Sequence, residues 1–201
     1  MNIGVHFQQI CHTTAPRRGL GLMLLFVSLA LTSEAVTAET PLEYKVKAAC
    51  LYNFVKFVEW PTNSFTNETA PVVFGVLGDD PFDGALDGAV AGRTVNSRPV
   101  QIVRFASLAE FERGPTCHLL FVSSTVKSQW ADVRAKLQGH SVLTVAEQDT
   151  FLNDGGVIRF LNENNKVRFS VNLEAARAAN LTISSELLKL AREVRGGSPK
   201  G

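Results

Sequence analysis

Apolar runs of strand length alternate with amphipathic stretches through the middle of the chain. The runs are Val72–Gly78, Cys117–Val122 and Ser141–Val145, and Val95–Phe105 contains a further predicted strand, strongest at Val100–Val103. Runs without polar alternation are typical of strands buried on both faces of a parallel sheet. The stretches between them, predicted as helices, are Phe82–Val90, a segment beginning at Ser107, and Lys127–Leu137. This rhythm predicts parallel βαβ units with right-handed crossovers.

A helix is predicted ahead of this region, over Glu43–Trp60, from apolar residues at helical spacing. We place Lys45, Lys47 and Lys56 on its solvent side. Pro61 should end the helix, because the residue before a proline disfavours helical backbone angles.

The pattern changes again after residue 156. Val157–Leu161 and Lys166–Val171 flank the polar segment Asn162–Asn165, which predicts an antiparallel hairpin. Helices are then expected at Leu173–Ala179 and Ser184–Val194. The whole pattern predicts an α/β fold of three layers: a mostly parallel sheet, helices on both faces, and the antiparallel C-terminal hairpin at the edge.

The N-terminal region predicts export. Leu20–Leu31 is an apolar run behind Arg17 and Arg18, and it is shorter than the roughly 20 residues of a transmembrane helix. Such a run, followed by the small residues of Val36–Ala38, is typical of a signal peptide cleaved after Ala38; an uncleaved anchor is the alternative. We therefore expect a signal peptide at 1–38, one domain at 39–195, and a disordered tail at 196–201.

Charge and cysteine content narrow the classes of function. The chain has 20 Lys and Arg against 19 Asp and Glu, and these become equal in number once residues 1–38 are removed. A nucleic-acid-binding domain would show a basic excess, so no nucleic-acid partner is expected. Export permits a disulfide between Cys50 and Cys117, but both lie in apolar segments where buried free thiols are common, and both alternatives stay open.

No catalytic motif is visible. Gly-x-Ser-x-Gly, the phosphate loop and the dinucleotide fingerprint are absent. His118 and His140 lack partners at metal-ligand spacing apart from Cys117, and adjacent residues of a strand point to opposite faces. We expect no enzyme activity, no catalytic residues, no metal site and no cofactor.

Two regions remain candidates for binding. Asp79 and Asp80 follow the first central strand, where open α/β sheets bind ligands; the alternative is a turn in which one aspartate caps the next helix. The C-terminal helices carry more apolar surface than packing on one face requires. The excess could serve a dimer or a partner, with core packing alone as the alternative.

These segments, taken in order, resemble the YfiR family of exported bacterial proteins. The matching pieces are Tyr44–Pro61, Val76–Gly78, Cys117–Ser124, Val142–Val145, Phe151 with Gly155–Ile158, Val167–Asn172 and Leu187–Ala191. Each piece is weak alone, but the ordered set is specific and covers nearly the whole exported chain.

The resemblance implies a periplasmic repressor that binds an inner-membrane diguanylate cyclase and thereby controls cyclic-di-GMP and biofilm formation. It also implies a homodimer, and an outer-membrane lipoprotein that sequesters the repressor through an apolar pocket. Carried onto this sequence, that pocket comprises Leu173, Ala176, Ile183, Ser185 and Leu188. A small-molecule sensor module that uses Asp79 and Asp80 for another membrane receptor is the alternative.

The sequence departs from the family at its cysteines. Gly75 stands where the family often has a cysteine that pairs with the one at position 117. Leu152 and Arg159 stand where a second pair often lies. Redox control through those bridges is therefore in doubt, and Cys50 is the remaining candidate partner for Cys117.

Overall fold

The fold was analysed on a computed structural model, which describes residues 41–197. The signal peptide, its cleavage after Ala38 and most of the expected tail lie outside the described residues and stay predictions.

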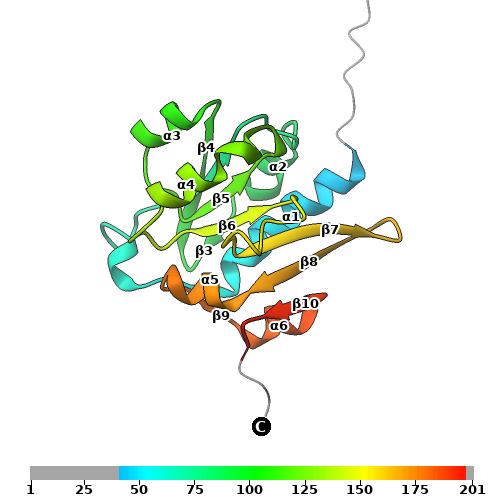
Figure 1. Cartoon of the computed structure of the whole chain (residues 1–201). Coiled ribbons are helices and arrows are strands. Elements are labelled where there is room, and N and C mark those ends of the chain that lie inside the picture. Colours follow the sequence, from blue (N-terminus) through cyan, green and yellow to red (C-terminus); the bar gives the residue numbers. More distant parts are fainter. Residues whose placement is uncertain (1–40, 198–201) are drawn as a thin grey trace, which may run out of the picture. The chain divides into compact units, whose positions relative to one another are not determined.

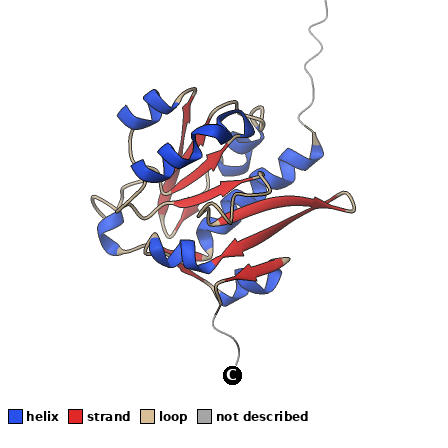
Figure 2. Ribbon diagram, in the orientation of Figure 1, coloured by secondary structure: helices blue, strands red, loops and turns tan. Residues whose placement is uncertain are grey.

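An eight-stranded sheet forms the centre of the described chain (Figures 1 and 2). In sheet order its strands are β10 (Glu193–Arg195), β8 (Lys166–Asn172), β7 (Ile158–Glu163), β6 (Leu143–Ala146), β5 (Leu119–Val122), β2 (Val72–Leu77), β4 (Arg98–Phe105) and β3 (Thr94–Val95). A separate two-stranded sheet pairs β1 (Val58–Glu59) with β9 (Thr182–Ile183).

The central strands are parallel, as their uninterrupted apolar runs predict. β2 pairs in parallel with β4 and β5, β5 with β6, and β6 with β7. Every residue of β2, β5 and β6 is buried. The β7–β8 hairpin is antiparallel, as is the pair β3–β4. The α/β class is confirmed.

Helices and their hydrophobic clusters lie against two faces of the sheet. The helical segments are α1 (Leu42–Lys56), η1 (Thr62–Ser64), α2 (Ala85–Val90), α3 (Leu108–Arg113), η2 (Ser124–Gln129), α4 (Trp130–Lys136), α5 (Leu173–Ala178) and α6 (Ser185–Leu190). The α1-side cluster joins α1, α2, α5 and α6 to strand residues such as Phe74 and Phe121. The α4-side cluster joins α3, η2 and α4 to alternate residues such as Leu77 and Leu120.

Two predicted helices are shorter than expected because strand pairing takes over their ends. α1 stops at Lys56 rather than Trp60, and Val58–Glu59 pairs with β9. The last helix stops at Leu190 rather than Val194, since Glu193–Arg195 forms β10 and pairs in parallel with β8. The hairpin is therefore one strand in from the edge, which β10 occupies.

The strand predicted within Val95–Phe105 is confirmed as β4, and a tight turn before it adds the short strand β3, which was not expected. Asn96 and Ser97 both have positive φ, 50° and 65°. Two consecutive positive φ angles are typical of a type I′ hairpin turn, in which asparagine is favoured. This turn makes β3 the opposite, antiparallel edge of the sheet.

His118, immediately before β5, connects the loop after α1 to the sheet through hydrogen bonds. Its Nδ1 accepts a hydrogen bond from the Val73 backbone N–H at 3.0 Å, so its Nε2 carries the proton and donates to the Ser64 carbonyl at 3.1 Å. The imidazole stacks on Phe65 at 4.3 Å, and the Arg98 guanidinium lies 4.0 Å from the centre of that phenyl ring. Burial, helped by the charge of Arg98, lowers the pKa of His118 below its usual value despite the bond to Ser64.

This histidine should make the fold sensitive to acid. As pH falls through the ordinary histidine pKa of 6.5, the unfolded chain takes up a proton before the folded chain does, so stability present above that pH is progressively lost below it. We expect the urea midpoint to fall between about pH 7.5 and about pH 5 in the wild type and in His140→Asn, which alters an exposed histidine, and to fall less in His118→Asn. An equal decline in all three proteins would contradict this role.

Candidate functional site

The five residues expected to bind a partner are brought to one side of the sheet. Ala176 and Ile183 are buried in the α1-side cluster, and Leu173 and Leu188 are half-buried against it. Ser185, at the start of α6, is exposed. We call these five residues the C-terminal surface. Only its three outer members are accessible, so Ala176 and Ile183 support this surface from below.

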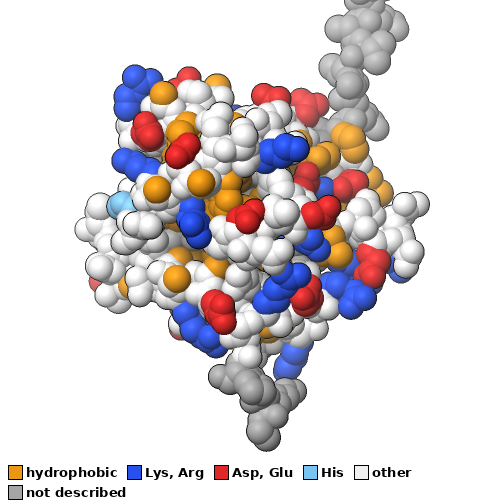
Figure 3. Space-filling view, in the orientation of Figure 1, with side chains coloured by type: hydrophobic (Ala, Val, Ile, Leu, Met, Phe, Trp, Pro, Cys, Tyr) orange, Lys and Arg blue, Asp and Glu red, His pale blue; other side chains and the backbone are white. Residues whose placement is uncertain are grey.

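Large apolar side chains beside this surface face solvent. On α6, Leu190 is 66% exposed, and on β10, Val194 is 38% exposed. Acidic and basic side chains are interspersed on the face of the molecule seen in Figure 3. Leu190 and Val194 are therefore apolar side chains that core packing does not explain.

The aspartates after β2 are held in the turn. Asp80 accepts hydrogen bonds from the Phe82 backbone N–H at 2.8 Å and from Arg104 Nε at 2.6 Å. Arg104 also pairs with Asp87, and its hydrogen bond lowers the pKa of that carboxyl. Asp79 is exposed, and its backbone N–H donates to Thr125 Oγ1 at 3.2 Å. Asp80 therefore stabilises the turn and does not cap the next helix, because α2 begins after Gly84 without a side-chain capping bond.

Cys50 and Cys117 are both free, which is the second of the two alternatives that the sequence left open. Cys50 packs against the α1-side cluster and Cys117 belongs to the α4-side cluster, so the sheet separates the two thiols. Burial raises the pKa of the Cys117 thiol to about 12 and also raises that of Cys50. Neither thiol is activated for nucleophilic chemistry.

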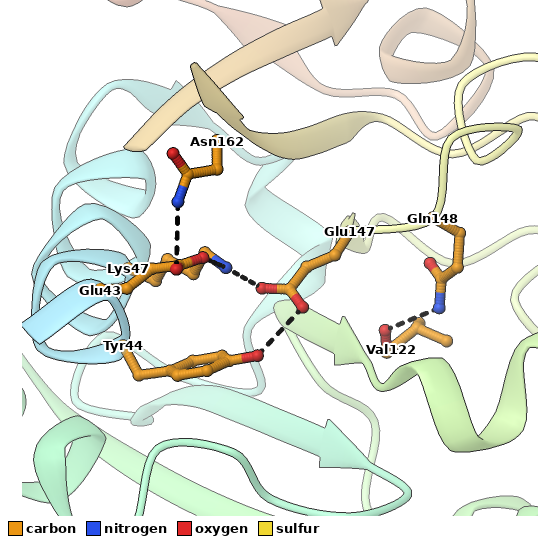
Figure 4. A network of polar contacts seen from close by, with 7 residues as sticks. All are labelled: Glu43, Tyr44, Lys47, Val122, Glu147, Gln148 and Asn162. Carbon is orange, nitrogen blue, oxygen red and sulfur yellow. Dashed lines mark hydrogen bonds and ion pairs between the residues drawn. The ribbon is translucent and has the colours of Figure 1, made fainter. Parts of the chain in front are cut away.

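The position of Lys47 corrects the sequence analysis, which placed this residue on the solvent side of α1. The side chain is buried and forms ion pairs with Glu43 and Glu147 (Figure 4). Tyr44 Oη donates to Glu147 at 3.3 Å, and Asn162 Nδ2 donates to Glu43 at 3.1 Å. The network links α1 to the loop after β6 and to β7.

The carboxylates keep this buried lysine charged. Burial alone would lower the pKa of Lys47, but the hydrogen bonds and charges of Glu147 and Glu43 outweigh it and raise the pKa. One sequence signal could have revealed the burial. Lys47 and Leu51, four residues apart, lie on the helix face that carries the buried Phe54.

Within residues 41–197, no group of three or more His, Cys, Asp or Glu side chains is arranged to hold a metal ion. In the same part of the chain, no helix is long and apolar enough to cross a membrane.

A family profile covers most of the chain: that of the YfiR/HmsC-like domain matches residues 44–192. The chain belongs to the YfiR/HmsC-like family. Membership supports a general role as a periplasmic regulatory domain. No curated protein matches the sequence.

Solved structures share the fold of this YfiR/HmsC-like domain at low identity. One is an ABC domain from Streptococcus pneumonia in complex with L-Trp, with a TM-score of 0.50 and 13% identity over 73% of this chain. Another is a conserved domain protein from Vibrio cholerae, with a TM-score of 0.51 and 11% identity over 78% of this chain. The chain spans 60% of the length of each, and the likeness concerns the fold alone.

Gly75, which stands where the family often has a cysteine, is closely surrounded by other side chains. A Cβ atom at Gly75 would lie 2.6 Å from Cys117 Sγ and 2.9 Å from Leu120 Cδ1. The Gly75→Cys variant should therefore form a bridge to Cys117 under oxidising conditions, after a small local shift. Thiol titration of the unfolded exported chain should then detect only Cys50.

The matched control for this variant is Gly75→Ser, which adds a similar side chain without a bridge. It should lose about 1–3 kcal/mol of stability through overpacking. Three reactive thiols in the oxidised Gly75→Cys protein would contradict the geometry.

Lys47→Met should destabilise the domain by about 1–3 kcal/mol, because Glu43 and Glu147 would face each other without their cation. Both glutamates are partly exposed (36% and 26%), so the loss should stay below that of a fully buried pair. Chemical denaturation measures this loss of stability. The exposed Lys45→Met on the same helix should change stability by less than about 0.5 kcal/mol, and adding Glu147→Gln to Lys47→Met should restore part of the loss.

Proposed function

We propose that this protein is a periplasmic repressor that binds the periplasmic part of an inner-membrane signalling protein, a diguanylate cyclase, and holds it inactive. Family membership over residues 44–192 is the observation that carries the proposal. Loss of the repressor would then raise cyclic-di-GMP and favour biofilm formation.

The C-terminal surface is the proposed docking site. Ser185, Leu188 and Leu173 are its accessible members, and the neighbouring Leu190 is largely exposed. Apolar side chains that water surrounds in the free protein can be buried by a partner, which supplies the driving force for association. An outer-membrane lipoprotein that offers an apolar side chain to this surface would compete for the repressor. We further propose that the working form is a homodimer.

The geometry allows a partner-binding test that spares the core. Ser185→Arg adds bulk and charge at an exposed position, so it should leave stability within about 0.5 kcal/mol of the wild type and weaken partner capture about tenfold or more. Ser124→Arg is the matched control, an exposed serine beside the α4-side cluster. Pull-down from solubilised inner membranes, followed by identification of the captured protein, measures the effect.

Cellular cyclic-di-GMP provides the second measurement. A deletion strain should contain more of the nucleotide, and Ser124→Arg should restore its level while Ser185→Arg should not. An unchanged nucleotide level in the deletion strain, with no membrane protein captured, would exclude the repressor function.

A further inference from the structure

A cavity of about 500 Å³ lies between α4 and α5, and its lining contains none of the five residues of the C-terminal surface. Its walls include Trp130, Arg134 and Leu137 from α4 and the turn after it, and Glu174 and Ala178 from α5. Val142 and Thr144, at the amino end of β6, also line it. The volume falls within the range of roughly 300–1,000 Å³ that is typical of small-molecule sites.

The wall formed by Trp130 is rigid. Its indole is only 7% exposed, packs 4.6 Å from the Phe151 ring, and donates from Nε1 to the Asp154 carbonyl at 2.9 Å. Its polar atom is therefore occupied, and the face that it offers is apolar. Leu137 and Ala178 continue this apolar wall.

Arg134 provides a cation without an acidic partner. Within residues 41–197 this side chain forms no ion pair. It lies over Gly155, where a Cβ atom would stand 2.9 Å from Arg134 Nη1, and the φ of +86° at this position also favours glycine. The Gly155 turn therefore leaves space for the Arg134 guanidinium at the cavity wall, and the guanidinium N–H groups can donate hydrogen bonds to an oxyanion.

The other polar groups limit the charge of a ligand. The Asn172 amide is engaged, since its Nδ2 donates to the Leu152 carbonyl and its Oδ1 accepts from the Glu174 and Ala175 backbone N–H groups. Glu174 adds a carboxylate to the cavity wall, which disfavours a ligand with two negative charges. A ligand with one negative charge and an apolar body therefore fits the residues that line the cavity.

We propose that this cavity binds a small organic monocarboxylate, whose head group pairs with Arg134 and whose apolar body packs against Trp130 and Leu137. α5 supplies Ala178 to this cavity and Ala176 to the C-terminal surface, so the two sites share one helix. The binding itself does not depend on the repressor function, and purified protein tests it separately.

Trp130 serves as the reporter in the test. The chain has two tryptophans, and Trp60→Phe leaves Trp130 as the only one. Phenylacetate and hexanoate are titrated into this protein, with phenylacetamide and hexanamide as uncharged matches. We expect a saturable change in fluorescence with the acids, and binding at least about tenfold weaker for the amides. Calorimetry on the wild type gives the same comparison if Trp60→Phe does not fold.

Two variants locate the site. Arg134→Gln should weaken acid binding about tenfold or more, whereas Lys136→Gln, which removes an exposed charge from the same helix, should leave it unchanged. Ala178→Phe, at an exposed position, should fill the cavity and abolish binding without unfolding the chain. The absence of saturable binding at millimolar acid, equal binding of acid and amide, or equal binding by Arg134→Gln would each overturn the proposal.

Discussion

The structure depends on the burial of both faces of β2, β5 and β6. Phe74 and Phe121 enter the cluster beneath α1, whereas Leu77 and Leu120 enter the cluster beneath α4. Because a strand buried on both faces needs covering on both, the helices lie on both sides of the sheet: α2 lies with α1 on one side, and α3 and α4 lie on the other. The same burial separates Cys50 from Cys117 and crowds Gly75, where any added side chain requires a local shift of Cys117 or Leu120.

Electrostatic pairing positions the elements around this core. Lys47 is buried at the start of α1 with a carboxylate from the loop after β6, so the helix is fixed relative to the carboxyl ends of the central strands. Arg104 and Asp80 close the neighbouring turn. These contacts occupy the end of the sheet where ligands of open α/β folds usually bind. The open cavity lies at the amino end of β6 instead.

This arrangement places both proposed binding functions toward the C-terminal part of the chain. α5 has one side in the α1-side cluster and another against the cavity, and α6 carries exposed Leu190 next to the C-terminal surface. The proposed repressor function requires accessible surface that a partner can cover. The last helices, which cover only the margin of the core, can provide that surface without loss of the fold.

The sequence by itself determined the α/β class, the central strands, the hairpin and the family, because uninterrupted apolar runs and ordered motifs are local signals. It could not determine where two of the helices stop and a strand follows. Val58–Glu59 and Glu193–Arg195 form strands only because they pair with segments distant in the chain. The burial of Lys47 was likewise decided by Glu147, one hundred residues away. The cavity at Arg134 exists only because α4, the turn at Gly155 and α5 converge in space. Long-range pairing and packing decided these features, and only the burial of Lys47 left a local signal, its place on the helix face of Leu51 and Phe54.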